Sequence, residues 1–157
     1  MEKIESARTK MTNVSGGCLC GAITYTSTTN GKVGVCHCSM CRRWSGGPAF
    51  ALEHSADLHV TGDEHLTVYK SSDWGERCFC KTCGTNLFWR SPTYNHVSIM
   101  AGTLTDDAAL TFTNQIFIDN KPGYYDFANE TKNMTEAEVI AMFTANDGNT
   151  NSESSNG

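Results

Sequence analysis

The chain has 157 residues, of which 39% are hydrophobic and 18% are charged, a length and composition that fit one domain with its own hydrophobic core. Its formal net charge of −5 argues against a nucleic-acid-binding domain, because such domains are as a rule strongly basic. The charged first ten residues lack the apolar stretch of a secretory signal, and no apolar run approaches the ~20 residues of a membrane span, so we expect a cytoplasmic protein with no membrane role.

The first part of the chain predicts a loose leader followed by strands. Residues 1–14 are polar and charged without an apolar period. Short apolar or β-branched stretches follow at 22–28, 48–53, 58–61, 66–70, 86–90, 96–100 and 110–118. Several of them alternate, as in Ile23-Thr24-Tyr25-Thr26, which is typical of antiparallel sheets. No helical pattern separates the stretches, so we predict a mainly β fold and not a doubly wound α/β one.

One helix is predicted near the carboxyl terminus. Thr135 and Glu138 have the spacing of a capping box, which satisfies the first free N–H groups of a helix. The apolar face of this short helix would consist of Val139, Ile140, Met142 and Phe143. We expect it to fade near Ala145, because residues 146–157 contain no apolar side chain and predict a disordered tail. The predicted domain is therefore 15–145.

The eight cysteines form three clusters. They are Cys18 and Cys20; Cys36, Cys38 and Cys41; and Cys78, Cys80 and Cys83. Disulfides are not expected in a reducing compartment, whereas short cysteine pairs that return from distant positions are typical of tetrahedral zinc sites. An iron–sulfur cluster is one alternative. A redox Cys-x-x-Cys is another, but it calls for a βαβ context that is missing here. We predict zinc.

The residues after each cluster divide the ligands into two sites. Gly21 and Gly84 each follow a cysteine, and a glycine there lets backbone amides approach the sulfurs and offset the charge of a closed tetrathiolate. We therefore predict one structural zinc on Cys18, Cys20, Cys80 and Cys83. The central cluster is followed by arginines, and its three thiolates leave a fourth metal position open, as in catalytic sites. We predict a second, reactive zinc on Cys36, Cys38 and Cys41.

Two residues near the clusters keep alternative interpretations. Cys78 could face the same way as Cys80, be an inert buried thiol, or complete the central site as a fourth ligand. His37 lies between two predicted ligands, but alternation in an extended Cys-x-Cys directs its side chain away from them. We predict packing or hydrogen bonding for His37, and not a role in the chemistry.

Four motifs carry a family resemblance across residues 15–127. They are Gly17-Cys18-Leu19-Cys20-Gly21, Cys36-His37-Cys38-Ser39-Met40-Cys41-Arg42, Phe79-Cys80-Lys81-Thr82-Cys83-Gly84-Thr85 and Ala101-Gly102-Thr103-Leu104. Together they resemble the glutathione-dependent formaldehyde-activating enzyme and centromere protein V family. The resemblance implies a β-tent fold with the same two zinc sites, and Cys78 lies outside the family's ligand set. It also implies condensation of formaldehyde with glutathione to S-(hydroxymethyl)glutathione.

The predicted chemistry is that of a carbon–sulfur lyase. An open zinc on the central cluster would hold the substrate sulfur as thiolate; polarisation of the aldehyde oxygen is the alternative metal role. Arg42 and Arg43 follow the last ligand and could bind the carboxylates of a small thiol such as glutathione, unless they form a solvated surface or an ion pair. The alternative function is a non-enzymatic, zinc-stabilised β-module that binds a partner or a small thiol.

Overall fold

The computed structural model describes residues 10–106 and 109–155. The chain divides into two compact units, one formed by the residues up to Val33 together with Phe50–Thr111, and the other by Gly34–Ala49 together with the residues from Phe112 onward. Within the described residues, no helix is both long enough and apolar enough to cross a membrane.

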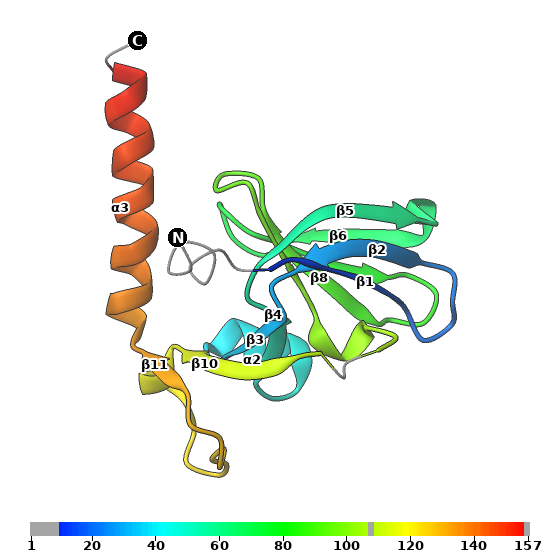
Figure 1. Cartoon of the computed structure of the whole chain (residues 1–157), viewed down its shortest axis with the longest axis horizontal. Helices are drawn as coiled ribbons and strands as arrows, with labels where there is room; N and C mark the ends of the chain where they lie inside the picture. The colour runs from blue at the N-terminus through cyan, green and yellow to red at the C-terminus, as the bar shows by residue number, and fades with distance from the viewer. Residues whose placement is uncertain (1–9, 107–108, 156–157) are drawn as a thin grey trace. The chain divides into compact units, whose positions relative to one another are not determined.

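The first unit consists of two antiparallel sheets. One has the strand order β1-β2-β5, with β1 at Thr12–Gly17, β2 at Thr24–Thr29 and β5 at Ser55–Thr61. Figure 1 shows β1 and β2 side by side. The other has the order β6-β7-β8-β9, with strands at Leu66–Lys70, Glu76–Cys80, Asn86–Ser91 and His96–Ile99. Two 3₁₀ turns, η1 at Asp63–His65 and η2 at Ala101–Thr103, complete the unit.

The core of the first unit is formed by inward-facing side chains of these strands. Its buried members include Ile23, Tyr25, Leu52, Leu87, Phe88 and Ile99. Tyr25 and Phe88 meet edge to face, with ring centroids 5.4 Å apart. Cys78 and Cys80 are fully buried members of the same core. Core packing alone therefore holds the carboxyl-terminal end of strand β7 in place.

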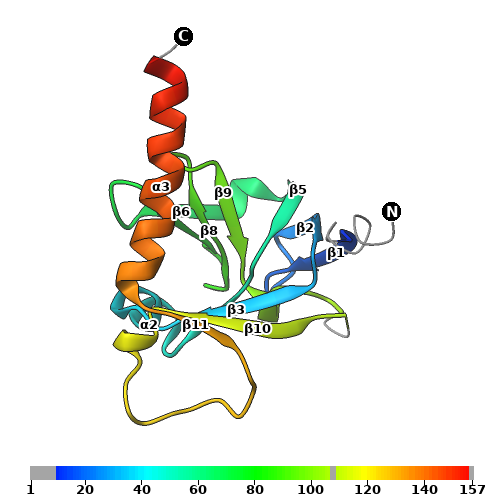
Figure 2. The ribbon, with the colours of Figure 1, turned by 60° about the vertical axis from the view of Figure 1, so that its left-hand side comes forward.

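A third sheet has the strand order β11-β10-β3-β4, with β3 at Lys32–Cys36, β4 at Ala49–Leu52, β10 at Thr111–Ile116 and β11 at Lys132–Met134. The second unit contains β11, most of β3 and β10 and the described α-helices, whereas β4 from Phe50 onward belongs to the first unit. Figure 2 shows β3, β10 and β11 side by side, and β10 and β11 run parallel. Helix α2 spans Ser39–Ser45, the 3₁₀ turn η3 spans Ile118–Asn120, and α3 spans Glu136–Ser155.

The predicted fold class is confirmed, with antiparallel sheets predominating and a helix near the carboxyl terminus. Every strand predicted from the sequence is present. The structure adds strands β1, β3, β7 and β11 and helix α2, which the sequence analysis did not predict. Strand β1 begins at Thr12, inside the predicted leader 1–14, because its polar residues pair with β2 along a largely exposed edge and need no apolar face. Residues 1–9 of that leader lie outside the described residues.

Helix α3 differs from its prediction in length and in packing. Its backbone continues to Ser155, past Ala145 and into the predicted tail 146–157. Once nucleated, a helix adds one hydrogen bond per residue without needing an apolar face, so a polar sequence can continue it. Val139 is buried, but Ile140 and Met142 are 51% and 45% exposed, so the predicted apolar face is only partly used.

The capping box at the start of α3 is confirmed. The backbone N–H of Glu138 donates to the Thr135 hydroxyl at 3.3 Å, and the N–H of Thr135 donates to the Glu138 carboxylate at 3.3 Å. We expect Thr135→Ala to cost the helix about 1 kcal/mol, because the N–H of Glu138 loses its acceptor and the Glu138 carboxylate loses the Thr135 hydroxyl. Circular dichroism and amide exchange at residues 136–138 measure this. Thr144→Ala, an exposed site in the same helix, is the control, and an equal effect of both variants would contradict the capping role.

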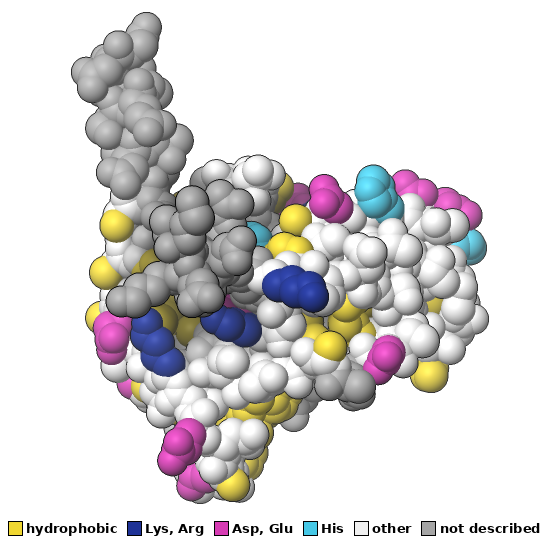
Figure 3. All heavy atoms as spheres, viewed as in Figure 1, with side chains coloured by type: hydrophobic (Ala, Val, Ile, Leu, Met, Phe, Trp, Pro, Cys, Tyr) yellow, Lys and Arg dark blue, Asp and Glu magenta, His cyan; other side chains and the backbone are white. Residues whose placement is uncertain are grey.

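The surface carries charge in small groups. On the face that Figure 3 shows, acidic side chains of the described residues occur singly or in pairs among polar and apolar ones. This agrees with the low charged content of the sequence, 18%. Charge therefore does not by itself mark a binding surface on this face.

Candidate metal centres

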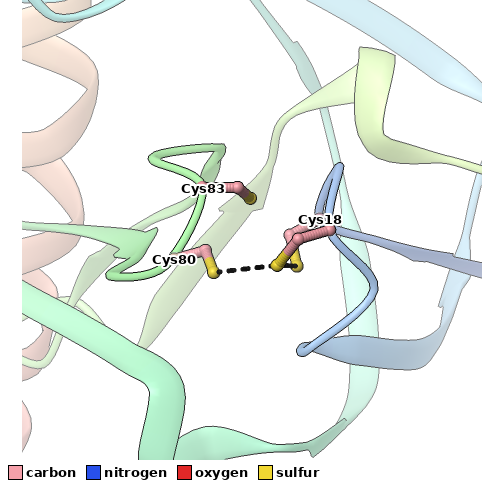
Figure 4. A group of neighbouring side chains, drawn as sticks. Cys18, Cys80 and Cys83 are labelled. Carbon is pink, nitrogen blue, oxygen red and sulfur yellow. Dashed lines mark hydrogen bonds between the residues drawn. The ribbon is translucent and has the colours of Figure 1, made fainter.

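The first cluster joins two turns of the first unit that are far apart in the sequence. Cys18 and Cys20 lie between β1 and β2, whereas Cys80 ends β7 and Cys83 lies in the turn to β8. The four sulfurs all lie within 4.8 Å of one another. The Sγ atoms of Cys18 and Cys20 are 3.6 Å apart, and those of Cys20 and Cys80 are 3.8 Å apart. Figure 4 shows Cys18, Cys80 and Cys83 pointing toward one another. Four thiols so arranged could hold one tetrahedral metal ion.

The turns carry backbone groups that hold the sulfurs in place. Gly21 and Gly84 adopt φ values of 80° and 79°, the left-handed conformation that favours glycine. Their N–H groups donate to the carbonyls of Cys18 and Cys80 at 3.1 and 2.8 Å, which closes each turn. The N–H that reaches the Cys18 sulfur comes from Ile23, at 3.3 Å. The glycines thus shape the turns, and the residue just before β2 supplies the donor.

Thr85 connects the two turns. Its hydroxyl oxygen accepts from the backbone N–H of Leu19 at 3.0 Å and lies 3.1 Å from the sulfur of Cys83. Hydrogen bonds from Thr85 to the sulfur lower the pKa of Cys83 to about 5. A single hydroxyl therefore links both halves of the cluster and favours the thiolate form of one of its members.

The second cluster lies at the junction of β3 and α2. Cys36 is the last residue of β3, Cys38 is the N-cap of α2, and Cys41 lies within the helix. The Sγ of Cys38 accepts from the N–H of Cys41 at 3.4 Å, so the Cys-x-x-Cys spacing here is that of a helix N-cap. The three sulfurs lie within 4.8 Å of one another. They could hold a metal ion and leave one position of a tetrahedron for another ligand.

The electrostatics of the second cluster favour a cation among the sulfurs. Hydrogen bonds with Cys38 and Cys41, together with burial, raise the pKa of Cys36 far above its usual range. Three adjacent thiols cannot all ionise while nothing offsets their charge. A soft or borderline divalent cation would allow them to do so, because coordination deprotonates a thiol outright. The donor set is therefore suited to a thiophilic metal such as zinc.

His37 is buried and fully hydrogen-bonded, as the sequence predicts. None of its surface is exposed, and its ring nitrogens Nδ1 and Nε2 lie 2.8 Å from the Tyr125 hydroxyl and 2.7 Å from Oε1 of Gln115. Burial lowers its pKa. Its two partners follow it by 88 and 78 residues, and no local sequence signal indicates them.

The two arginines after the second cluster differ in their surroundings. Arg42 is half-buried, and its Nε donates to the carbonyl oxygen of His37 at 2.8 Å. Arg43 is exposed. Part of the Arg42 guanidinium is therefore engaged in fixing the cluster's own backbone, whereas Arg43 is open to solvent. Their predicted contacts to substrate carboxylates stay a prediction.

Cys78 belongs to neither group of sulfurs. Its side chain is fully buried in the core of the first unit, and burial raises its pKa. Its neighbour Cys80 joins the four-cysteine cluster, although only one residue separates them; a register shift in the β7–β8 pairing lies directly after Cys78. Of the three interpretations of Cys78 that the sequence allows, this environment fits the inert buried thiol.

The sequence also matches a known protein family. Residues 13–120 match the model of the family described as glutathione-dependent formaldehyde-activating enzyme. The chain belongs to this family. The match covers all seven clustered cysteines and confirms the resemblance recognised in the four motifs.

Relatives of the formaldehyde-activating enzyme family include named proteins and a solved structure. An uncharacterized lyase of Schizosaccharomyces pombe is 35% identical over 136 residues, which cover 83% of this chain and 96% of the relative. A Halomonas elongata protein that bears the family's name is 29% identical over 125 residues, 72% of this chain and 80% of the relative. A crystal structure of a Rhodobacter sphaeroides protein matches with a TM-score of 0.51 and 26% identity, covering 63% of this chain and 99% of that one.

Proposed function

We propose that the protein is a zinc-dependent carbon–sulfur lyase that condenses glutathione with formaldehyde to S-(hydroxymethyl)glutathione. The observation that carries the proposal is the three-cysteine cluster, in a chain that belongs to the formaldehyde-activating enzyme family. Three sulfurs from one short segment satisfy three positions of a tetrahedral ion and leave the fourth available to a thiol. The names of the two curated relatives, a lyase and a formaldehyde-activating enzyme, support the same reaction class.

The two clusters would have different tasks. Cys18, Cys20, Cys80 and Cys83 would hold a structural zinc that ties the turn after β1 to the end of β7. Cys36, Cys38 and Cys41 would hold the reactive zinc. When bound there, zinc supplies a coordination position at which a small thiol is favoured as its thiolate. Both donor sets consist only of sulfur, the ligand type typical of zinc sites in proteins.

The condensation itself needs little from the protein beyond binding and a proton. The sulfur of glutathione forms a bond to the aldehyde carbon, and the carbonyl oxygen takes the proton that the thiol gives up. Arg43, exposed two residues after the cluster's last ligand, would attract a carboxylate of the tripeptide. Arg42 contributes less, because its Nε already holds the backbone of His37.

The first test is the metal content. We expect two zinc ions per chain, because the seven clustered cysteines form two separate donor sets. Mass spectrometry of the native protein and elemental analysis of the same sample measure this. A single zinc, or an iron–sulfur absorption spectrum, would contradict the assignment.

The second test is turnover. Glutathione and formaldehyde equilibrate with their adduct without help, so the enzyme is expected to accelerate the exchange and leave the equilibrium unchanged. Exchange NMR on the adduct's methylene signal measures the rate at a fixed protein concentration. Binding of glutathione without any acceleration would favour the non-enzymatic zinc module instead.

A further inference from the structure

Every polar atom of His37 has a partner within the second unit. Its backbone N–H donates to the carbonyl of Ile116 at 3.2 Å, and its own carbonyl accepts from Nε of Arg42 at 2.8 Å. The ring is held on both sides, by the Tyr125 hydroxyl and by Gln115. Among the described residues, no buried side-chain nitrogen or oxygen lacks a partner. His37 is thus fixed both through its backbone and through its ring, directly between Cys36 and Cys38.

The hydrogen bonds beyond Gln115 define which ring nitrogen carries the proton. The Thr131 hydroxyl donates to Oδ1 of Asn133 at 2.7 Å, so its oxygen is left to accept from the Gln115 amide nitrogen at 2.9 Å. This directs the carbonyl oxygen of Gln115 to Nε2 of His37, which must then be the donor. In the neutral ring, Nδ1 then accepts the Tyr125 hydroxyl proton. The directions of these hydrogen bonds fit a neutral ring with its proton on Nε2.

Tyr125 is itself anchored. The ammonium of Lys121 donates to the backbone carbonyl of Tyr125, lies 5.2 Å from the centroid of its ring and pairs with Asp126 at 2.7 Å. The Phe127 ring packs against both His37 and Tyr125, at centroid distances of 6.1 and 5.9 Å. The imidazole is therefore held between Gln115 of β10 and a loop that the Lys121–Asp126 ion pair and the packed rings of Tyr125 and Phe127 hold together.

We propose that His37 is the positioning residue of the three-cysteine cluster: clamped by Tyr125 and Gln115, it holds Cys36 and Cys38 where one metal ion can bind both. The inference rests on the proposed metal at this cluster. Without these hydrogen bonds, the position of the Cys36 sulfur would depend on the end of β3, and that of the Cys38 sulfur on the N-cap of α2. Backbones fray at both kinds of position. With them, His37 is fixed before the metal arrives. Residues that orient metal ligands without binding the metal themselves typically raise the metal affinity about 10–100-fold.

Cobalt(II) is the probe that tests this role, because its absorption reports both binding and ligand geometry at thiolate sites. The metal-free, reduced protein is titrated with Co²⁺. The bands are assigned with Cys38→Ala, which removes one donor of the three-cysteine cluster, and with Cys80→Ala, which does the same for the other. His37→Phe keeps a ring of similar size but loses both ring hydrogen bonds. His37→Gln keeps an amide N–H that can reach Gln115. His96→Phe, a half-buried histidine of the first unit, is the matched control.

We expect His37→Phe to weaken Co²⁺ binding at the three-cysteine cluster about 10–100-fold and to shift its visible band, with His37→Gln in between. The four-cysteine band and the His96→Phe variant should be unchanged. Unaltered affinity and band in a folded His37→Phe would overturn the inference alone. A parent that takes up no cobalt at this cluster would overturn the proposed metal site as well.

A second variant tests the same role if His37→Phe does not fold. Tyr125→Phe retains the ring and its packing and removes only the hydroxyl that donates to Nδ1. We expect a several-fold weaker Co²⁺ affinity and a band shift in the same direction. An affinity and a band equal to those of the parent would overturn the role of the clamp.

Discussion

Replacing Cys80 with alanine is expected to remove one zinc per chain and to lower the free energy of unfolding by an amount on the order of 5 kcal/mol. Structural zinc contributes about 10–16 kcal/mol of binding energy in small zinc-dependent peptides, and a domain with its own core should lose part of that. Cys80 is fully buried, and its sulfur meets a cysteine 60 positions earlier, so the lost link joins distant parts of the first unit. Thermal and denaturant unfolding, with zinc analysis, measure both effects.

Cys78→Ala is the matched control for this change. It lies two residues earlier in the same strand, is equally buried, and belongs to neither cluster. Its loss removes one buried sulfur from the core and is expected to cost about 1–2 kcal/mol with both zinc ions retained. If the two alanine variants lose equal stability and equal zinc, the partition of the cysteines is wrong.

Replacing Cys38 with serine is expected to abolish glutathione binding and turnover while the protein stays folded. The sulfur is lost from the three-cysteine cluster, and the count should fall from two zinc ions to one. Serine is a good N-cap, so the cap of α2 that the Cys38 sulfur now provides is preserved. The cluster spans only residues 36–41, and a metal that closes so short a loop removes little chain entropy, so we expect the melting temperature to change by a few degrees at most.

Calorimetric titration with glutathione and the exchange NMR rate measure the functional effect of Cys38→Ser. Met40→Ala is the control, since Met40 is exposed in the same turn and offers no cluster ligand. It should bind and turn over as the parent does. Undiminished glutathione binding in Cys38→Ser would show that this cluster is not where the thiol binds.

The sequence predicts the two groups of sulfurs because spacing alone limits which thiols can meet. Cys36, Cys38 and Cys41 are neighbours in any conformation, and the glycines after Cys20 and Cys83 mark two turns of one kind. Alternation also predicts that the His37 side chain leaves the ligand side. Local rules therefore suffice for the grouping of the seven sulfurs and for the burial of this histidine.

The unpredicted elements depend on contacts that local rules do not contain. The residues of strand β7 do not alternate clearly between polar and apolar side chains, so the sequence does not predict a strand there. Its cysteines suggest a metal-binding turn instead. Helix α2 has seven residues, too few for an apolar period. Its N-cap is a cysteine, which is not among the usual capping residues. The partners of His37 become visible only when β10 and the loop carrying Tyr125 are placed in space.

The separation of the four clustered cysteines along the chain would set an order for metal binding during synthesis. A growing chain has the thiols of residues 36–41 available together as soon as they leave the ribosome, whereas the other site must wait until Cys83 has followed Cys18. The residues that clamp His37 emerge still later, at positions 115 and 125. The three-cysteine cluster therefore offers its sulfurs first and acquires its fixed geometry last, so a metal ion captured early would be held at first only by residues 36–41 of an unfolded chain.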